Sequence, residues 1–342
     1  MKLTLFAPTA FLPHTKRPVI LLYPFLGNPE TNKEDPDYGR FDEYVREGKE
    51  IFSLTDDPAS ADFFVLPFEF SFSPDDLKLE QQLDDLAGKY NKRVLVFFNS
   101  DLTDSIPMRN AVIFRTSFYR SSRRPNEFAF PGWSLDFMKL GIPDASTPMK
   151  PSKPSVSYCG YVDYLSPAEW LSPRYALNRI TRRFQRTNMA GQAIRGKAVR
   201  ALRHDRRIIS RFIIRSGFWA PGFDKKLARR EYAENIFAAD YAIVTRGAGN
   251  FSYRLYEVLS CGRIPVFIDT DAVLPFDHLI DWKKFVVWVP QDEVSRIAEK
   301  IISFHQSLSD EEFLALKKSC RQLYEDWICP ASFYGNIQKC LE

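Results

Sequence analysis

The sequence is poor in cysteine, histidine and long apolar runs, and each shortage excludes a class of protein. Among 342 residues there are five Cys and four His, and no Cys-x-x-Cys pair occurs. A disulfide framework and a Cys/His zinc site are therefore not expected, and we predict no metal. The longest apolar runs, residues 19–26 and 264–268, are far shorter than the roughly 18 residues that a membrane-spanning helix needs.

The first eight residues contain one charge and a short apolar stretch that ends at Pro8. This pattern predicts a first strand rather than a secretion signal. The sparse and odd set of cysteines fits a reducing compartment. We therefore expect a cytoplasmic protein.

Apolar residues, in contrast, are abundant. The chain is 45% hydrophobic and holds 29 Phe and 15 Tyr, so it can bury a large core. Strand-like runs alternate with helical stretches, which predicts an α/β fold with parallel sheets. In the first half these runs are Leu3–Phe6, Val19–Tyr23, Phe63–Pro67, Val94–Phe98 and Val112–Phe114.

The length favours two domains. Four prolines within residues 143–154 resist both helix and sheet, so we place the domain boundary there. The expected division is an N-terminal Rossmann-like domain over 1–150 and a C-terminal Rossmann-like domain over 151–325. A final segment, 326–342, could pack back on the first domain.

Charge is unevenly distributed. Residues 179–215 hold 12 Arg or Lys and one acid, Asp205, whereas the remaining 35 basic and 42 acidic residues give the rest of the chain a balance of −7. Helical spacing of several of these arginines is typical of a solvated helix face. Attraction to an anionic acceptor, to a membrane or to nucleic acid is the alternative, although no nucleic-acid-binding motif accompanies the segment.

The most informative stretch combines two strands, a glycine loop and a helix. Tyr241–Thr245 and Ile264–Ile268 are buried-strand patterns, and Phe251–Cys261 between them has helical periodicity. In such a unit the loop and the helix N-terminus lie at the carboxyl edge of the sheet, where open α/β folds bind nucleotides.

The loop carries groups suited to a diphosphate. Its glycines allow close backbone approach, the first N–H groups of the helix can donate to phosphate oxygens, and two arginines add positive charge. Glu257, one helical turn after Arg254, could bind the hydroxyls of a ribose. The predicted donor-binding residues are Arg246, Gly247, Gly249, Asn250, Ser252, Arg254 and Glu257.

A glycine pair between strand and helix can also be purely conformational. The full dinucleotide fingerprint is absent, because Ser252 stands where the third glycine would be, and the loop has no Gly-Lys-Ser. A nicotinamide or flavin cofactor and a P-loop ATPase are thereby disfavoured.

Residues 239–268, ADYAIVTRGAGNFSYRLYEVLSCGRIPVFI, resemble the core of the exostosin-type glycosyltransferases, glycosyltransferase family 47. The order of the Arg-Gly loop, the Ser-x-Arg-x-x-Glu helix and the Gly-x-Ile-Pro-Val strand carries the resemblance. The stretch TDDPASADFFVLPF at 55–68 and the segments 274–276 and 280–282 are similar to further parts of that family.

The resemblance implies two Rossmann-like domains facing a cleft, the glycosyltransferase B fold. It also implies an inverting transfer without an obligatory metal or cofactor, from a nucleotide sugar, expected to be a UDP-sugar, held mainly by the C-terminal domain. Eukaryotic members usually carry a transmembrane anchor. Its absence here implies a soluble, bacterial-type version, cytoplasmic or peripheral to the inner face of the membrane.

An inverting transfer needs a base that takes the proton of the acceptor hydroxyl. Two carboxylates follow N-terminal strands: Asp101, which we prefer because Asn99-Ser100-Asp101 is a polar break after an apolar run, and Glu69. A loop or capping role is the alternative for each. Further candidates for sugar or acceptor contacts are Gly160, Asp163 and Asp269.

The sequence thus predicts a glycosyltransferase that acts on a glycan or lipid-linked glycan acceptor in surface polysaccharide synthesis. Two alternatives stay open: a non-catalytic nucleotide- or carbohydrate-binding protein of the same fold, and a nucleic-acid-binding protein that uses residues 179–215.

Overall fold

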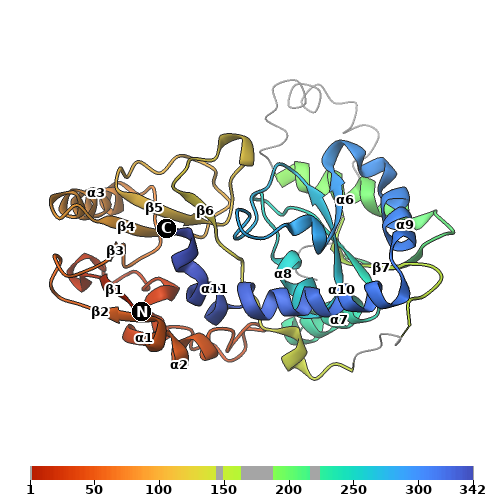
Figure 1. Cartoon of the computed structure of the whole chain (residues 1–342), viewed down its shortest axis with the longest axis horizontal. Coiled ribbons are helices and arrows are strands. Elements are labelled where there is room, and N and C mark those ends of the chain that lie inside the picture. The colour runs from red at the N-terminus through yellow and green to blue at the C-terminus, as the bar shows by residue number, and fades with distance from the viewer. Residues whose placement is uncertain (1, 144–148, 163–187, 216–223, 342) are drawn as a thin grey trace.

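The protein is built on two parallel β-sheets, one in each half of the chain (Figure 1). The structure, a computed structural model, describes residues 2–143, 149–162, 188–215 and 224–341. Every pairing within the two sheets is parallel, as the alternation of strands and helices predicts. The predicted fold class is confirmed.

The N-terminal sheet has six strands in the order β2-β1-β3-β4-β5-β6. Its central strands are apolar on both faces, which is typical of a parallel sheet covered on both sides. The strands are β1 (Leu3–Phe6), β2 (Phe52–Leu54), β3 (Phe63–Val65), β4 (Arg93–Phe98), β5 (Ala111–Arg115) and β6 (Glu127–Ala129).

The C-terminal sheet has five strands in the order β11-β10-β9-β7-β8. β9 and β10, which flank the glycine loop and its helix, lie side by side near the middle of this sheet. The strands are β7 (Ser155–Tyr161), β8 (Ile209–Arg215), β9 (Tyr241–Val244), β10 (Ile264–Asp269) and β11 (Val287–Pro290).

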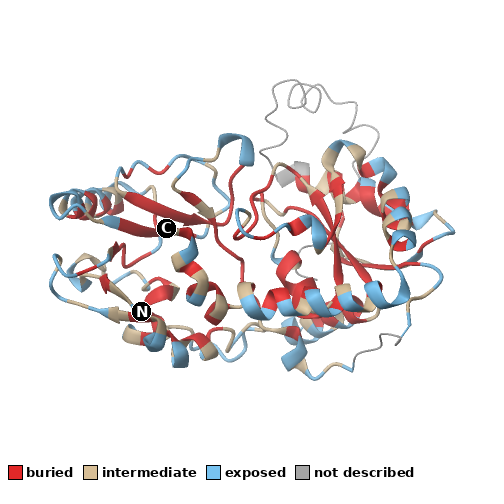
Figure 2. Ribbon diagram, viewed as in Figure 1, coloured by how far each residue is buried: buried red, intermediate tan, exposed pale blue. Residues whose placement is uncertain are grey.

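Helices surround both sheets with their outer faces in water, and the central strands are buried (Figure 2). Among the described residues, no helix is long and apolar enough to cross a bilayer. The α-helices in the described parts of the chain are α1 (Tyr23–Leu26), α2 (Asp42–Ile51), α3 (Pro74–Lys89), α6 (Asn188–Arg203), α7 (Lys225–Phe237), α8 (Tyr253–Ser260), α9 (Ile297–Ser307), α10 (Asp310–Leu323) and α11 (Pro330–Asn336).

One predicted strand is wrong. Residues 19–23 form a 3₁₀ turn, Ile20–Leu22, that leads directly into α1. Pro24 stands in the first turn of α1, where its missing N–H costs nothing. A short buried apolar run does not distinguish a strand from a helical turn, and here the proline decides. The three-residue strands β2 and β6 were not predicted, because runs of that length carry little periodicity.

The chain crosses between the domains twice. The first crossing lies between β6 and β7, and the second lies between α10 and α11. α11 belongs with the N-terminal sheet: the Tyr334 ring stacks on Tyr44 of α2 with the ring centres 4.4 Å apart. The indole N–H of Trp133 in the first crossing donates to the Ile328 carbonyl in the second, at 2.8 Å, so the two crossings are joined.

Arg115, at the end of β5, organises the loops at the carboxyl edge of the N-terminal sheet. Its side chain is 1% exposed and pairs with the buried Glu127 carboxylate, with Nη1 to Oε1 at 2.9 Å. The remaining guanidinium N–H groups donate to the backbone carbonyls of Leu102, Asp104 and Ser117. One buried cation therefore positions the segment that follows Asp101 and the backbone of Ser117.

Arg115→Met is expected to lower the free energy of unfolding by about 3–5 kcal/mol, because it leaves the Glu127 carboxylate buried without its partner. Arg109→Ala is the matched control. It removes an exposed pair with Asp85 and should change stability by less than about 1 kcal/mol. Urea unfolding of both variants checks this, and equal midpoints would contradict the assigned role of Arg115.

Candidate functional site

The glycine loop joins β9 to α8 and lies against the N-terminal domain. The loop is closed by its own bond, from the Gly247 N–H to the Phe251 carbonyl at 2.9 Å. Ser252 precedes the first residue of α8, and its side chain makes no capping bond. The sequence signals for strand, loop and helix are therefore correct in type and position.

The backbone N–H groups predicted to bind phosphate are bonded to the other domain. Gly249 N–H donates to Asp101 Oδ1 at 2.9 Å, and Asn250 N–H donates to Ser117 Oγ at 2.8 Å. A Cβ at position 249 would lie 2.6 Å from Asp101 Oδ1, so only glycine fits this approach. Gly249 is therefore needed so that the Asp101 carboxylate of the protein itself can approach the loop.

The two predicted arginines are held in place by the protein, Arg246 buried and Arg254 partly buried. Arg246 donates through Nη1 to the Tyr119 hydroxyl and through Nη2 to the Ala248 carbonyl, both at 3.0 Å. Arg254 lies over the Tyr158 ring, 4.4 Å from its centre, and donates to the Cys159 carbonyl at 2.6 Å. Both guanidinium groups are thus fixed near the carboxyl edge of the C-terminal sheet.

Glu257 is 6% exposed, and its carboxylate accepts from protein donors on both oxygens. Oε1 accepts from Ser134 Oγ at 2.7 Å and from Arg229 Nη1 at 2.8 Å, and Oε2 accepts from the Tyr232 hydroxyl at 2.6 Å. Arg229 also pairs with Asp37 of the N-terminal domain. The sequence does not reveal this network, because its members come from four separate segments.

A third arginine near the loop comes from the basic segment. The structure describes residues 188–215 of that segment. Arg195 on α6 donates to Thr245 Oγ1 at 3.2 Å and to the Arg246 carbonyl at 3.0 Å. Burial and the neighbouring Arg254 charge lower the pKa of its guanidinium. The sequence analysis counted this arginine only as one charge of the basic segment 179–215.

The other candidate residues lie in different settings. Gly160 lies beside Arg254: a Cβ at position 160 would be 3.1 Å from Arg254 Nη2. Asp269 accepts from Arg120 Nη2 of the N-terminal domain at 3.2 Å, so it joins the two domains. Asp163 lies outside the described residues.

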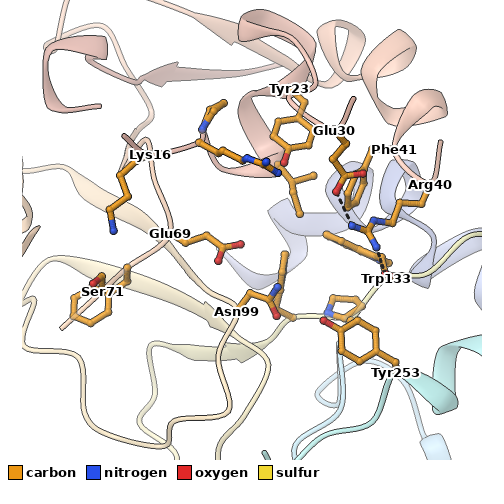
Figure 3. Close-up of a pocket in the computed structure, with 17 residues that line it drawn as sticks. Lys16, Tyr23, Glu30, Arg40, Phe41, Glu69, Ser71, Asn99, Trp133 and Tyr253 are labelled. Carbon is orange, nitrogen blue, oxygen red and sulfur yellow. Dashed lines mark hydrogen bonds and ion pairs between the residues drawn. The ribbon is translucent and has the colours of Figure 1, made fainter. Parts of the chain in front are cut away.

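Glu69 lies in a pocket of about 430 Å³ at the carboxyl edge of the N-terminal sheet (Figure 3). Its side chain points into this pocket and faces Asn99 and Tyr253. The side chain is open to solvent, yet the pocket walls remove part of its hydration, and this desolvation raises the pKa of Glu69 to about 7. Among the residues that the structure describes, Glu69 has no hydrogen-bond or ion-pair partner.

Aromatic rings form much of the pocket wall, and one of them belongs to the other domain. Tyr253, the first residue of α8, reaches across to Gly132, where a Cβ would lie 2.7 Å from the ring. Tyr23, Phe41 and Trp133 complete an apolar side. Sequence reasoning missed these residues, since isolated aromatic side chains give no signal that separates a pocket wall from the core.

Cationic side chains are also present in the pocket. Arg40 pairs with Glu30 at 2.6 Å, and Lys16 pairs with Asp76 at 2.7 Å. Arg17 lies at the same wall and is exposed. The pocket therefore combines one carboxyl group that titrates near neutral pH, flat apolar surfaces and positive charge, which suits a carbohydrate.

The second half of the chain is similar to a known protein family. Residues 161–303 match the family model of the exostosin GT47 domain. The chain is 28% identical to Exostosin-1 of Drosophila melanogaster over 116 residues, which cover 34% of this chain and 14% of that protein. It is 30% identical to Exostosin-2 of Homo sapiens over 95 residues, which cover 28% and 13%.

A plant relative matches over a shorter stretch. The Probable glucuronosyltransferase GUT1 of Oryza sativa subsp. japonica is 36% identical over 66 residues, 19% of this chain and 16% of that protein. The chain thus spans a small part of the length of these curated relatives. Among solved structures, WaaG, a glycosyltransferase involved in lipopolysaccharide biosynthesis, aligns over 98% of this chain and 99% of its own, with a TM-score of 0.35 and 9% identity.

The family model and the curated relatives thus identify a glycosyltransferase-type domain over residues 161–303. The chain carries an exostosin GT47 domain and is a distant homologue of exostosins and glucuronosyltransferases, as the resemblance of residues 239–268 indicated.

Glu69 is expected to bind its proton more tightly in the folded protein than in the unfolded chain, where a glutamate titrates near 4.5. Its contribution to stability is therefore present in full below pH 4.5 and is lost as the pH rises through 7. Glu69→Gln should remove this loss. The difference between the unfolding midpoints of the wild type and Glu69→Gln, followed from pH 4 to 8, measures this loss of stability. ¹³C NMR of labelled glutamates shows the pH at which Glu69 titrates.

Glu80, whose pKa burial also raises to about 7, is retained in both proteins, so its effect cancels in the comparison. Identical pH profiles, or a Glu69 resonance that titrates near 4.5, would contradict the pocket assignment.

Proposed function

We propose that this protein is an inverting glycosyltransferase that moves a sugar from a nucleoside diphosphate, a UDP-sugar, to a glycan acceptor of a surface polysaccharide. The GT47 domain match supports the reaction class. The observation that carries the proposal at the level of residues is the position of the glycine loop, with Arg246 and Arg254 held beside it, at the carboxyl edge of the C-terminal sheet next to the N-terminal domain.

The donor would bind on the C-terminal side. The amides of Gly249 and Asn250 and the guanidinium groups of Arg246 and Arg254 are the donors that a diphosphate needs, and they would stabilise the leaving charge as the glycosidic bond breaks. Glu257 would accept the ribose hydroxyls, with Arg229 and Tyr232 holding its carboxylate in place.

The acceptor would bind in the pocket of Glu69. Its hydroxyl loses a proton to the base as it attacks the anomeric carbon from the face opposite the diphosphate. A carboxyl group with a pKa near 7 is a stronger base than an ordinary carboxylate and is still partly ionised at neutral pH. Asp101, the base that sequence reasoning preferred, accepts from the Gly249 N–H, so we assign the base to Glu69 instead.

The alternatives find less support. A purely nucleotide- or carbohydrate-binding protein would not need a pocket carboxyl group tuned to neutral pH. For nucleic acid, no binding motif accompanies the basic segment, and three of its described arginines contact other parts of the protein: Arg195 bonds the loop, Arg207 pairs with Asp205, and Arg215 pairs with Glu231.

Isothermal titration with UDP, GDP and CMP tests the donor site. At least one nucleoside diphosphate is expected to bind, and Arg246→Ala should weaken that binding at least tenfold because it removes a charge-assisted contact. Arg230→Ala, which removes an exposed pair with Glu234, is the control and should bind like the wild type. Absence of binding by every nucleotide would rule the proposal out.

Glu69→Gln should lower kcat by a factor on the order of 10²–10⁴ while nucleotide affinity is unchanged, because the amide cannot take a proton. In the wild-type protein kcat should rise with pH through about 7, as Glu69 ionises. Glu47→Gln on the exposed face of α2 is the control. Steady-state turnover of the donor identified above measures both, and an unaltered kcat in Glu69→Gln would remove Glu69 from the reaction.

A further inference from the structure

Four of the residues proposed to bind the nucleotide sugar are hydrogen-bonded to the N-terminal domain in this structure: an arginine, two backbone amides and a glutamate. The N-terminal partners come from three separate loops at the edge of their sheet. The pairs are Arg246 with Tyr119 at 3.0 Å, Gly249 with Asp101 at 2.9 Å, Asn250 with Ser117 at 2.8 Å, and Glu257 with Ser134 at 2.7 Å.

The Asp101 contact is the most informative of these. Its carboxylate oxygen accepts from the same N–H that a phosphate oxygen would use, and it carries the same sign of charge. The closeness of Asp101 Oδ1 to Gly249 leaves no room for a second oxygen at that amide. Asp101 and a diphosphate therefore exclude each other by volume and by repulsion.

Polar contacts beyond the loop hold the two domains in this position. Arg123 pairs with Asp277 through both carboxylate oxygens, at 2.8 and 2.9 Å, and both side chains are only partly exposed. Ser121 donates to Asp271 at 2.5 Å. None of these four residues belongs to the predicted donor site, so they can be altered without touching it.

We propose that the N-terminal domain plugs the donor site, with Asp101 as an intramolecular competitor of the donor diphosphate, and that the domains must part before the nucleotide sugar binds. This inference rests on the proposed function, because it takes the Arg246–Glu257 segment as the donor site. The apparent affinity for the nucleotide is then the intrinsic affinity reduced by the fraction of molecules that are open.

The test uses Arg123→Ala and Asp277→Ala, which weaken closure from either side, and Asp101→Ala, which removes the competitor. Nucleoside diphosphate affinity is measured by isothermal titration, and the radius of gyration by small-angle X-ray scattering with and without nucleotide. Arg109→Ala, which breaks an exposed pair inside the N-terminal domain, is the control.

Each of the three variants is expected to bind nucleotide on the order of fivefold more tightly than the wild type, and the control is expected to bind equally. Arg123→Ala and Asp277→Ala should also have a larger radius of gyration without nucleotide, and the wild type should expand when nucleotide binds. Two variants on opposite partners of one ion pair guard against a folding defect in either.

Unchanged or weaker affinity in all three variants, with nucleotide still bound by the wild type, would overturn the plug while leaving the proposed function in place. Expanded variants that bind no nucleoside diphosphate at all would overturn the proposed function, and the plug with it.

Discussion

The contact between the glycine loop and the edge of the opposite sheet is the constraint on which the rest of the site depends. Two backbone N–H groups of the C-terminal domain donate to side-chain oxygens of Asp101 and Ser117. The buried guanidinium of Arg115 positions the segments that carry those oxygens. A single buried ion pair in one domain thus determines what the loop of the other domain contacts.

The loop, its strands and its helix could be predicted because their signals are local. Thirty residues contain all of these signals: the periodicity of the hydrophobic residues, two glycines and the spacing from Arg254 to Glu257. The segment has the predicted strands and helix. The N-cap of α3 is equally local: Ser73 directly precedes Pro74, the first residue of the helix, and its side chain accepts from the Asp76 N–H.

What could not be predicted depends on residues far apart in the chain. The raised pKa of Glu69 comes from pocket walls that include Tyr253 of α8, a residue far along the chain. The polar break at Asn99-Ser100-Asp101 correctly marks the end of a strand, but no sequence pattern says that the carboxylate there meets Gly249. Arg195 was counted as one charge of the basic segment, and only its bonds to Thr245 and to the Arg246 carbonyl distinguish it from the others.

The second crossing of the chain has a consequence for how the protein is made. Phe333 and Tyr334 of α11 fill the aromatic cluster of the N-terminal domain, against Phe130, Phe97 and Tyr44. When only the first 150 residues have emerged from the ribosome, the core of the N-terminal sheet therefore still lacks these two rings. The domain that begins first can finish folding only after residues 330–336 have emerged, so its nascent form must wait with apolar surface uncovered through the synthesis of the entire second domain.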